Sequence, residues 1–349
     1  MPDVKVKPAR KHHILPKSYL KRFAQGDKIW VLDFELKKQY QSNIEDAATI
    51  KDFYTVKTIE KDEDDSVEQN FLSKIESLAG PTIDHIIKTR TFKDRPQWDI
   101  LANFTALMYV RGPLFRQIIL EVYEHFANTL SKEILKDEAT FNSIMQKVED
   151  KVKISLPLTY EKAVEVQNHS EITVDIPRTY YIRLMMEYAN KLVPIIGQMT
   201  PNLLCVPFGC EARFVTGDVP TIPAPRNPNA SNMWIGDPNC DLYFPLSSRC
   251  CLVLNYDSLR KVNDVSTRRI AFVNHLVACN CTRIILSENQ TFVWMQENGI
   301  TSDNQQHLID SWGPEKKTNL KTKFSNGNPL PVCRNDWNLL TSDDKKSKK

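Results

Sequence analysis

Two adjacent histidines near the start of the chain have side chains suited to catalysis. His12 and His13 come directly before Ile14 and lead into the segment ILPKSYLKRF, which has to bury Leu20 and Phe23. Histidines held in a turn of this kind can supply a general base or a metal ligand. The alternative is a surface pair, and the sequence alone does not decide which of the two rings faces inward.

An arginine interrupts the apolar stripe of the long helical pattern over residues 97–132. Four apolar residues of this stripe follow at positions i, i+3, i+7 and i+14: Leu101, Phe104, Met108 and Phe115. Arg111 takes position i+10, and an arginine that faces a core must be paired or must bind an anion. Arg116 comes after an expected kink at Gly112-Pro113 and can assist it. The alternative is a structural ion pair.

Two glutamates share one face of the helix that we expect to begin at Ser66, where Gln69 completes a capping box. Glu68 and Glu76 are two helical turns apart, about 12 Å along the axis, so both can reach one cleft but cannot share one metal ion directly. The alternative for both side chains is a solvated helix face.

A carboxylate follows the apolar strand expected over ARFVTGD. Asp218 comes directly after Gly217, and a carboxylate at a strand end beside a glycine is a frequent site geometry. Arg249 follows the strand expected over DLYFPL and could pair with Asp218 if the two strands are neighbours. The alternative is an ordinary turn.

The sequence lacks the usual signatures of several enzyme classes. It contains no phosphate-binding glycine loop, no GxSxG nucleophile elbow and no HExxH zinc motif. All eight cysteines follow residue 204, without any CxxC pair, and most lie in apolar runs. We therefore expect buried thiols in a reducing compartment rather than a cysteine metal site or a disulfide framework.

The elements that must position these residues change in character near residue 200. A short helix and a β-hairpin come first, helical patterns continue to about residue 199, and short β-like runs follow with a helix over 266–279 and another from Asn289. We predict an α+β fold, with the hairpin and a large helical region packed on a small sheet formed late in the sequence. The predicted organisation is a basic flexible tail (1–11), one α+β domain (12–300, mainly helical over 12–200 and mixed over 201–300) and a polar, basic extension (301–349).

The charge of the chain is concentrated at its two ends. The 349 residues are 41% hydrophobic and 26% charged, which excludes collagen, rod and wholly disordered classes. Residues 1–22 carry seven Lys/Arg and one Asp, and residues 314–349 carry nine Lys/Arg and four acids, within a net charge of +3. Basic ends can bind nucleic acid, although they can also simply keep a protein soluble. With neither a membrane-length apolar run nor a signal sequence, we expect a cytoplasmic protein.

Several strings resemble, in order, the bacterial family called domain of unknown function 4238, over roughly residues 10–295. They are HHILPKSYLKRFA, KIWVLDF, KDFYTV, VEQNFLSKIES, the Arg111 helix, FVTGDVP and FPLSSRCCLVL. Gly217 stands where the family usually has Ser, and Ser248 where it often has Pro. The family has no assigned activity, so the resemblance implies positions rather than a mechanism. The implied site residues are His13, Glu68, Glu76, Arg111, Asp218 and Arg249.

The first functional hypothesis is a phosphodiester hydrolase acting on nucleic acid. His13 or His12 would serve as base or metal ligand, Glu76 and Asp218 would take part in catalysis, and together with Glu68 they would hold Mg²⁺ or Mn²⁺. The phosphate would be held by three arginines: Arg111, Arg249 and Arg116. In bacteria, such an enzyme would suit antiviral defence or a toxin. The same residues also fit hydrolysis of a small nucleotide.

The second hypothesis is a non-catalytic interaction protein. The same polar residues would then form a sealed ion-pair network, and the loop over 219–233 would meet a protein partner. Exposure separates the two hypotheses, because a site opens into a concave pocket and a structural network does not.

Overall fold

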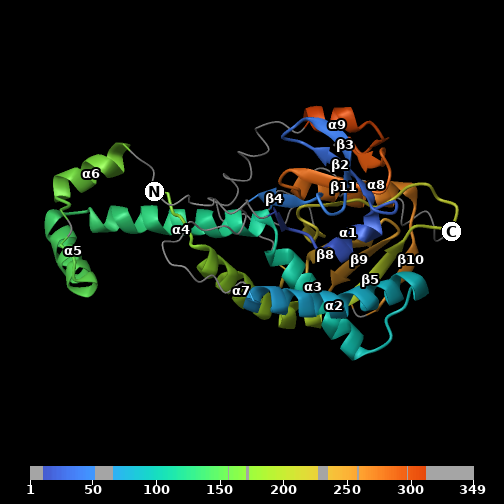
Figure 1. Cartoon of the computed structure of the whole chain (residues 1–349), viewed down its shortest axis with the longest axis horizontal. Helices are drawn as coiled ribbons and strands as arrows, with labels where there is room; N and C mark the ends of the chain where they lie inside the picture. Colours follow the sequence, from blue (N-terminus) through green and yellow to red (C-terminus); the bar gives the residue numbers. More distant parts are fainter. Residues whose placement is uncertain are drawn as a thin grey trace, which may run out of the picture. The chain divides into compact units, whose positions relative to one another are not determined.

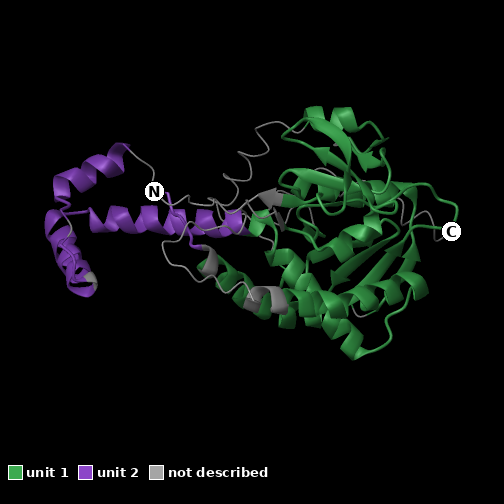
Figure 2. Cartoon of the chain, viewed as in Figure 1, with its two compact units in different colours: residues 1–115, 178–349 green, residues 116–177 purple. Residues whose placement is uncertain are grey.

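The computed structural model describes residues 11–51, 66–155, 157–169, 173–226, 235–257, 259–296 and 298–311. Helices and sheets are both abundant in these ranges, so the predicted α+β class is confirmed. The chain forms two compact units: residues 1–115 with 178–349, and residues 116–177 (Figure 2). Within the described ranges, no helix combines the length and apolar content that a membrane span requires.

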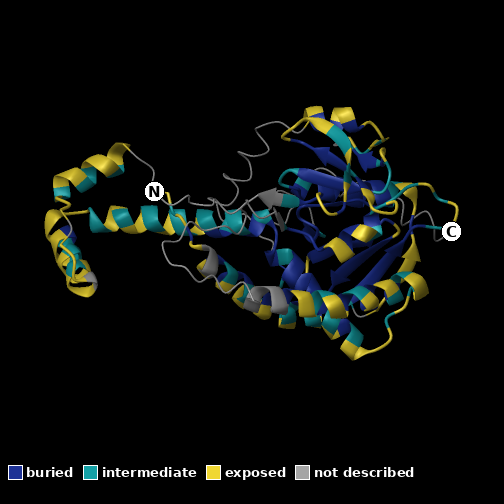
Figure 3. Ribbon diagram, in the orientation of Figure 1, coloured by how far each residue is buried: buried dark blue, intermediate teal, exposed yellow. Residues whose placement is uncertain are grey.

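The larger sheet of the first unit has five strands. They are β5 (Thr200–Cys205), β7 (Ile222–Pro225), β8 (Cys240–Ser247), β9 (Cys250–Asn255) and β10 (Val262–Asp264), in the order β10-β5-β9-β8-β7. Within this sheet, β10 and β5 run parallel and the other neighbours run antiparallel. Every residue of β8 and β9 is buried, as Figure 3 shows, because protein covers both faces of these central strands.

The second sheet joins the start of the chain to its late part. Its strands are β2 (Lys28–Asp33), β3 (Lys38–Asn43), β6 (Thr216–Gly217) and β11 (Ile284–Ser287), in the order β3-β2-β11-β6. The β2–β3 hairpin was expected, but its pairing with β11 was not. The N-terminal hairpin is therefore part of a sheet whose other strands come late in the sequence.

Two further strand pairs complete the described β-structure. β1 (Lys11–His13) pairs with β4 (Thr49–Lys51), and β12 (Trp294–Met295) pairs with β13 (Thr301–Ser302). The helix predicted to begin near Asn289 is thus wrong. The last described helix begins later, as α9 (Gln305–Ser311).

Besides α9 and the first turn of α4 (Pro113–Ile134), the described helices of the first unit lie on the sheets. They are α1 (Lys17–Leu20), α2 (Ser66–Thr89), α3 (Arg95–Val110), α7 (Arg178–Gln198) and α8 (Thr267–Asn280), with a 3-10 turn over Lys21–Phe23. α3 packs against both α2 and α7, and Figure 1 shows these helices together along one side of the strands. α8 shares a core with both sheets, which contribute Leu32, Ile285, Leu204 and Val253 among others.

Two prolines lie inside helices without ending them. α2 continues through Gly80-Pro81, and α7 continues through Pro194. Arg22 bonds to α2 on both sides of Pro81, through the Gly80 carbonyl at 2.9 Å and the Asp84 carboxylate at 2.8 Å. This tertiary contact stabilises the helix where proline removes a backbone hydrogen bond. At Gly112-Pro113, by contrast, the chain does break.

The second unit consists of the greater part of α4 (Pro113–Ile134), with α5 (Glu138–Val152) and α6 (Tyr160–His169). Phe141 is buried against Tyr160, with ring centroids 5.8 Å apart, and the Tyr160 hydroxyl donates to the Leu135 carbonyl at 3.1 Å. Most other side chains of α5 and α6 remain partly or fully exposed. This unit therefore has only a small core of its own.

Candidate functional site

Three of the predicted site residues meet within the first unit, from β1, α2 and the end of α3. Arg111 follows the last turn of α3, and its backbone N–H bonds to the Leu107 carbonyl at 2.9 Å. Its Nη1 donates to the Glu76 carboxylate, and its Nη2 donates to the carbonyl oxygen of His13 at 3.1 Å. One guanidinium thus connects β1 to α2, as expected for a fork of donors that engages two acceptors at once.

Burial determines the electrostatics of this cluster. Arg111 is 7% exposed and His13 is half-buried, while 24% of the Glu76 side chain remains accessible. Burial lowers the pKa of His13, and the nearby positive charges of Lys17 and Arg111 lower it further, against the opposite effect of Glu45 and Asp46. His13 is therefore neutral at pH 7 and can accept a proton.

Two buried nitrogen atoms of the cluster have unused hydrogen-bonding capacity. Neither Nδ1 of His13 nor Nε of Arg111 has a partner among the described residues. Buried polar atoms without partners are uncommon, because each one costs about 1–3 kcal/mol. The two residues that carry them are joined by a hydrogen bond, so this unused capacity is concentrated at one place in the fold.

Asp218 has a different role from the one its position suggested. Its carboxylate accepts hydrogen bonds from the backbone N–H groups of Thr282 (2.8 Å), Arg283 (2.7 Å) and Ile284 (3.3 Å), and from the Thr282 hydroxyl (2.6 Å). Burial raises its pKa, and these hydrogen bonds oppose that shift. Both carboxylate oxygens therefore hold the start of β11 against the end of β6.

The backbone of Asp218 nevertheless lies beside the cluster. A Cβ atom added at Gly112 would stand 2.9 Å from the Asp218 carbonyl oxygen. This close approach explains the need for glycine directly after Arg111. The segments that contain Arg111 and Asp218 thus lie side by side, although the Asp218 carboxylate is directed to the turn over Thr282–Ile284.

The predicted Asp218–Arg249 pair does not form. Asp218 follows β6 of the four-stranded sheet, whereas Arg249 lies between β8 and β9 of the five-stranded sheet, so their strands are not neighbours. Arg249 is exposed, and its backbone N–H bonds to the Ser247 hydroxyl at 3.2 Å. The pairing was inferred from two strand ends, and strand order is the information that the sequence lacked.

The remaining predicted residues are not among those that the described structure brings together. Arg116 belongs to the second unit. The side chains of His12 and Glu68 are outside the described part of the structure, as is the capping box at Ser66. Much of the predicted partner loop over 219–233 is also outside it, from residue 227 onward.

A carboxylate-based metal centre is not assembled from the residues that can be placed. Among described side chains, no group of three or more His, Cys, Asp or Glu is arranged to hold a metal ion. In the proposed set, Glu76 bonds to Arg111, Asp218 is saturated by the β11 turn, and Glu68 lies outside the described side chains. Of the three carboxylates predicted to hold a metal ion, the two that the structure describes therefore already bond to protein groups.

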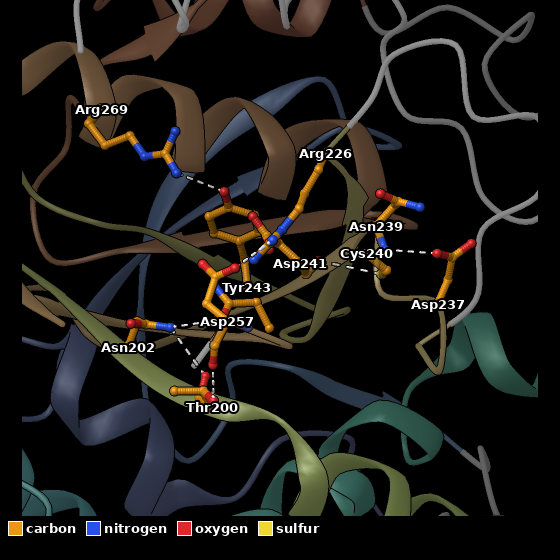
Figure 4. A network of polar contacts seen from close by, with 11 residues as sticks. Thr200, Asn202, Arg226, Asp237, Asn239, Cys240, Asp241, Tyr243, Asp257 and Arg269 are labelled. Atoms are coloured by element: carbon orange, nitrogen blue, oxygen red, sulfur yellow. Dashed lines mark hydrogen bonds and ion pairs between the residues drawn. The ribbon is translucent and has the colours of Figure 1, made fainter. Parts of the chain in front are cut away.

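A second polar network was missed by sequence reasoning (Figure 4). Arg226 bonds to Asp241 through Nε at 2.6 Å and to Asp257 through Nη1 at 2.8 Å. Burial raises the pKa of Asp241, against the effect of Arg226. Arg269 donates to the Tyr243 hydroxyl at 2.8 Å beside it. The Arg226 guanidinium is thus bonded to two carboxylates of the protein itself, which fits a structural role.

A sequence signal for this network did exist. β7 and β8 form an antiparallel pair in which Ala224 faces Asp241, so Arg226 follows one strand where the other begins. Reading 219–247 as a hairpin would have placed these opposite charges together. The proline-rich composition of the intervening segment instead suggested a long loop.

The family described as "Protein of unknown function (DUF4238)" matches the chain over residues 11–291. No curated protein and no solved structure matches the chain.

Proposed function

Since the chain belongs to the DUF4238 family, whose description leaves the function open, we propose a function from the site itself: phosphodiester hydrolysis on nucleic acid, with His13 as the acid–base group and Arg111 as the group that binds the phosphate. The observation that supports this proposal is the pair of buried nitrogen atoms without partners, His13 Nδ1 and Arg111 Nε. A phosphate oxygen would satisfy the arginine donor, and a neutral imidazole beside it is suited to accept a proton.

In the proposed reaction, neutral His13 takes a proton from the attacking water. The water oxygen bonds to phosphorus as the bond from phosphorus to the leaving oxygen breaks, and the leaving oxygen takes up a proton from the protonated ring or from solvent. Arg111 balances the negative charge on the phosphate. Glu76 acts as a positioning residue, because it holds the guanidinium from α2.

Nucleic acid is the favoured substrate because of the charge at the two ends of the chain. Residues 1–22 carry a local charge of +6 (seven Lys/Arg less one Asp), and residues 314–349 carry +5 (nine less four). Such segments attract a polyanion, and this attraction weakens as the salt concentration increases. In a bacterium, this activity would serve antiviral defence or act as a toxin. A small nucleotide is the second candidate substrate, since the cluster itself needs only one phosphate.

The test is cleavage of labelled single- and double-stranded RNA and DNA, and of small nucleotides, each with Mg²⁺, with Mn²⁺ and with EDTA. We expect cleavage that persists in EDTA and that falls about 100-fold in His13→Gln, because the variant lacks a general base. His85→Gln on α2, whose ring contacts Thr89, is the matched control and should cleave as the wild type does. Full activity in a folded His13→Gln protein would overturn the proposal. Cleavage that requires Mg²⁺ or Mn²⁺ would instead favour a metal-dependent phosphodiester hydrolase.

The pH dependence gives a second prediction. Burial and neighbouring cations lower the pKa of His13, so the catalytic neutral form persists to lower pH than in an ordinary histidine. We expect kcat/KM to rise with pH and to level off below the usual histidine pKa of about 6.5. The measurement is a pH–rate profile from about pH 4 to about pH 8, a range that brackets the ordinary value. An acid limb centred above that value would contradict His13 as the base.

A further inference from the structure

A cavity between α8, β12 and α9 contains a thiol and two imidazoles that the proposed phosphodiester chemistry does not use. Its volume is about 360 Å³, within the range typical of small-molecule sites. Cys279 and His275 of α8 line one wall, and Trp294 and His307 line it from the segments that follow. All of these residues belong to the first unit, so the cavity has a defined set of walls.

The two α8 residues are in contact with each other. The Cys279 sulfur lies 3.4 Å from Nε2 of His275, one helical turn earlier, where side chains four residues apart share a face. His275 is only 4% exposed, whereas Cys279 is partly accessible. A thiol within hydrogen-bonding reach of an imidazole and open to a cavity is the arrangement found at nucleophilic cysteines.

The remaining walls suit a small carbonyl compound. Trp294 and Leu308 are buried and supply apolar surface, while Gln296 and Asn298 supply amide groups that can donate to a carbonyl oxygen. The Gln296 amide lies 3.3 Å from Nδ1 of the exposed His307, which places both groups at the entrance. An apolar floor with a few polar groups at its edge is typical of a binding site.

We propose that Cys279 and His275 form a nucleophilic thiol–imidazole pair, and that the cavity accepts a small activated acyl group. With its proton on Nδ1, the His275 ring takes the thiol proton at Nε2. The sulfur then bonds to the carbonyl carbon, the bond to the leaving oxygen breaks, and the imidazolium returns the proton to that oxygen. A water molecule deprotonated by the same ring hydrolyses the thioester and restores the thiol.

The first test measures alkylation by iodoacetamide, in which the thiolate displaces iodide. At a pH of about 6.5, where a free thiol is only about 1% ionised, we expect Cys279 to react about tenfold faster than the partly exposed Cys210. Peptide mapping distinguishes the thiols. His275→Gln should remove this advantage, and Cys251, which is fully buried, should stay unlabelled in every folded variant.

The second test uses p-nitrophenyl acetate as the activated ester. We expect a burst of about one nitrophenolate per chain, as for an acyl-enzyme, with acetyl recovered on the Cys279 peptide. Cys279→Ser should lose the burst, while Cys210→Ser should keep it. Alkylation of Cys279 no faster than that of Cys210, or an unchanged rate in His275→Gln with Cys251 still protected, would overturn the thiol–imidazole pair. Fast alkylation without a burst would overturn the acyl assignment.

Discussion

Asp218→Ala is expected to lower the free energy of unfolding by about 3 kcal/mol, a large loss for a single substitution. The substitution removes the acceptor for three backbone N–H groups and one hydroxyl at the start of β11. Each donor left buried without a partner costs about 1–3 kcal/mol, partly offset because a buried carboxylate is also removed. The melting temperature should fall by about 4–5 °C, because the entropy of unfolding increases with the size of the chain.

Thr282→Val is the matched control for this change. It removes only the hydroxyl donor at 2.6 Å and leaves the carboxylate with its backbone partners. We expect a loss of about 1 kcal/mol, the usual value for one hydrogen bond. Thermal and urea unfolding of both variants provide the measurement. Equal, small losses in the two variants would show that Asp218 does not anchor the β11 turn. A loss of cleavage in Asp218→Ala must accordingly be corrected for its folded fraction.

Arg111→Met is expected to lower kcat/KM for phosphodiester cleavage by about 1000-fold, the upper end of what one preorganised donor contributes. The variant should also lose about 2 kcal/mol of stability, because Glu76 is left partly buried and unpaired. This figure is below that for a fully buried pair, since 24% of the Glu76 side chain is accessible to water. Steady-state kinetics and chemical unfolding measure the two effects separately.

The double variant Arg111→Met/Glu76→Gln distinguishes a functional arginine from a structural one. With Glu76 also neutral, no charge is stranded, so stability should recover toward that of the wild type. Cleavage should not recover, because the phosphate still lacks its cation. If activity returned together with stability, the cluster would be an ion-pair network and the interaction-protein hypothesis would gain.

The sequence predicted local features of the fold well and tertiary ones poorly. Arg111 could be found because helical periodicity requires an apolar residue at its position. The hydrogen-bond partners of Asp218 could not be predicted. A carboxylate at a strand end has the same local sequence whether it binds a ligand or caps a turn. The first of the residues that donate hydrogen bonds to Asp218, Thr282, lies 64 positions later in the sequence.

The helix breaks illustrate the same limit. Gly80-Pro81 and Gly112-Pro113 have the same local preference, yet only the second ends a helix. At the first site, Arg22 from another part of the chain bonds to the helix on both sides of the proline, and such a contact is not visible in the local sequence. Likewise, the β2–β3 hairpin follows from the local sequence, whereas its pairing with β11 depends on long-range packing.

The pairing of β2 with β11 has a consequence for how the protein is made. Arg283, at the start of β11, bonds to Asp33 at the end of β2, and the two are 250 residues apart. A ribosome adding about 5–20 residues per second needs roughly 12–50 s to synthesise that stretch. Throughout this time, the inner edge of the hairpin has no strand to pair with, and open edges promote association with other chains. During translation, the edge of the hairpin that pairs with β11 therefore stays open until this last strand of its sheet leaves the ribosome.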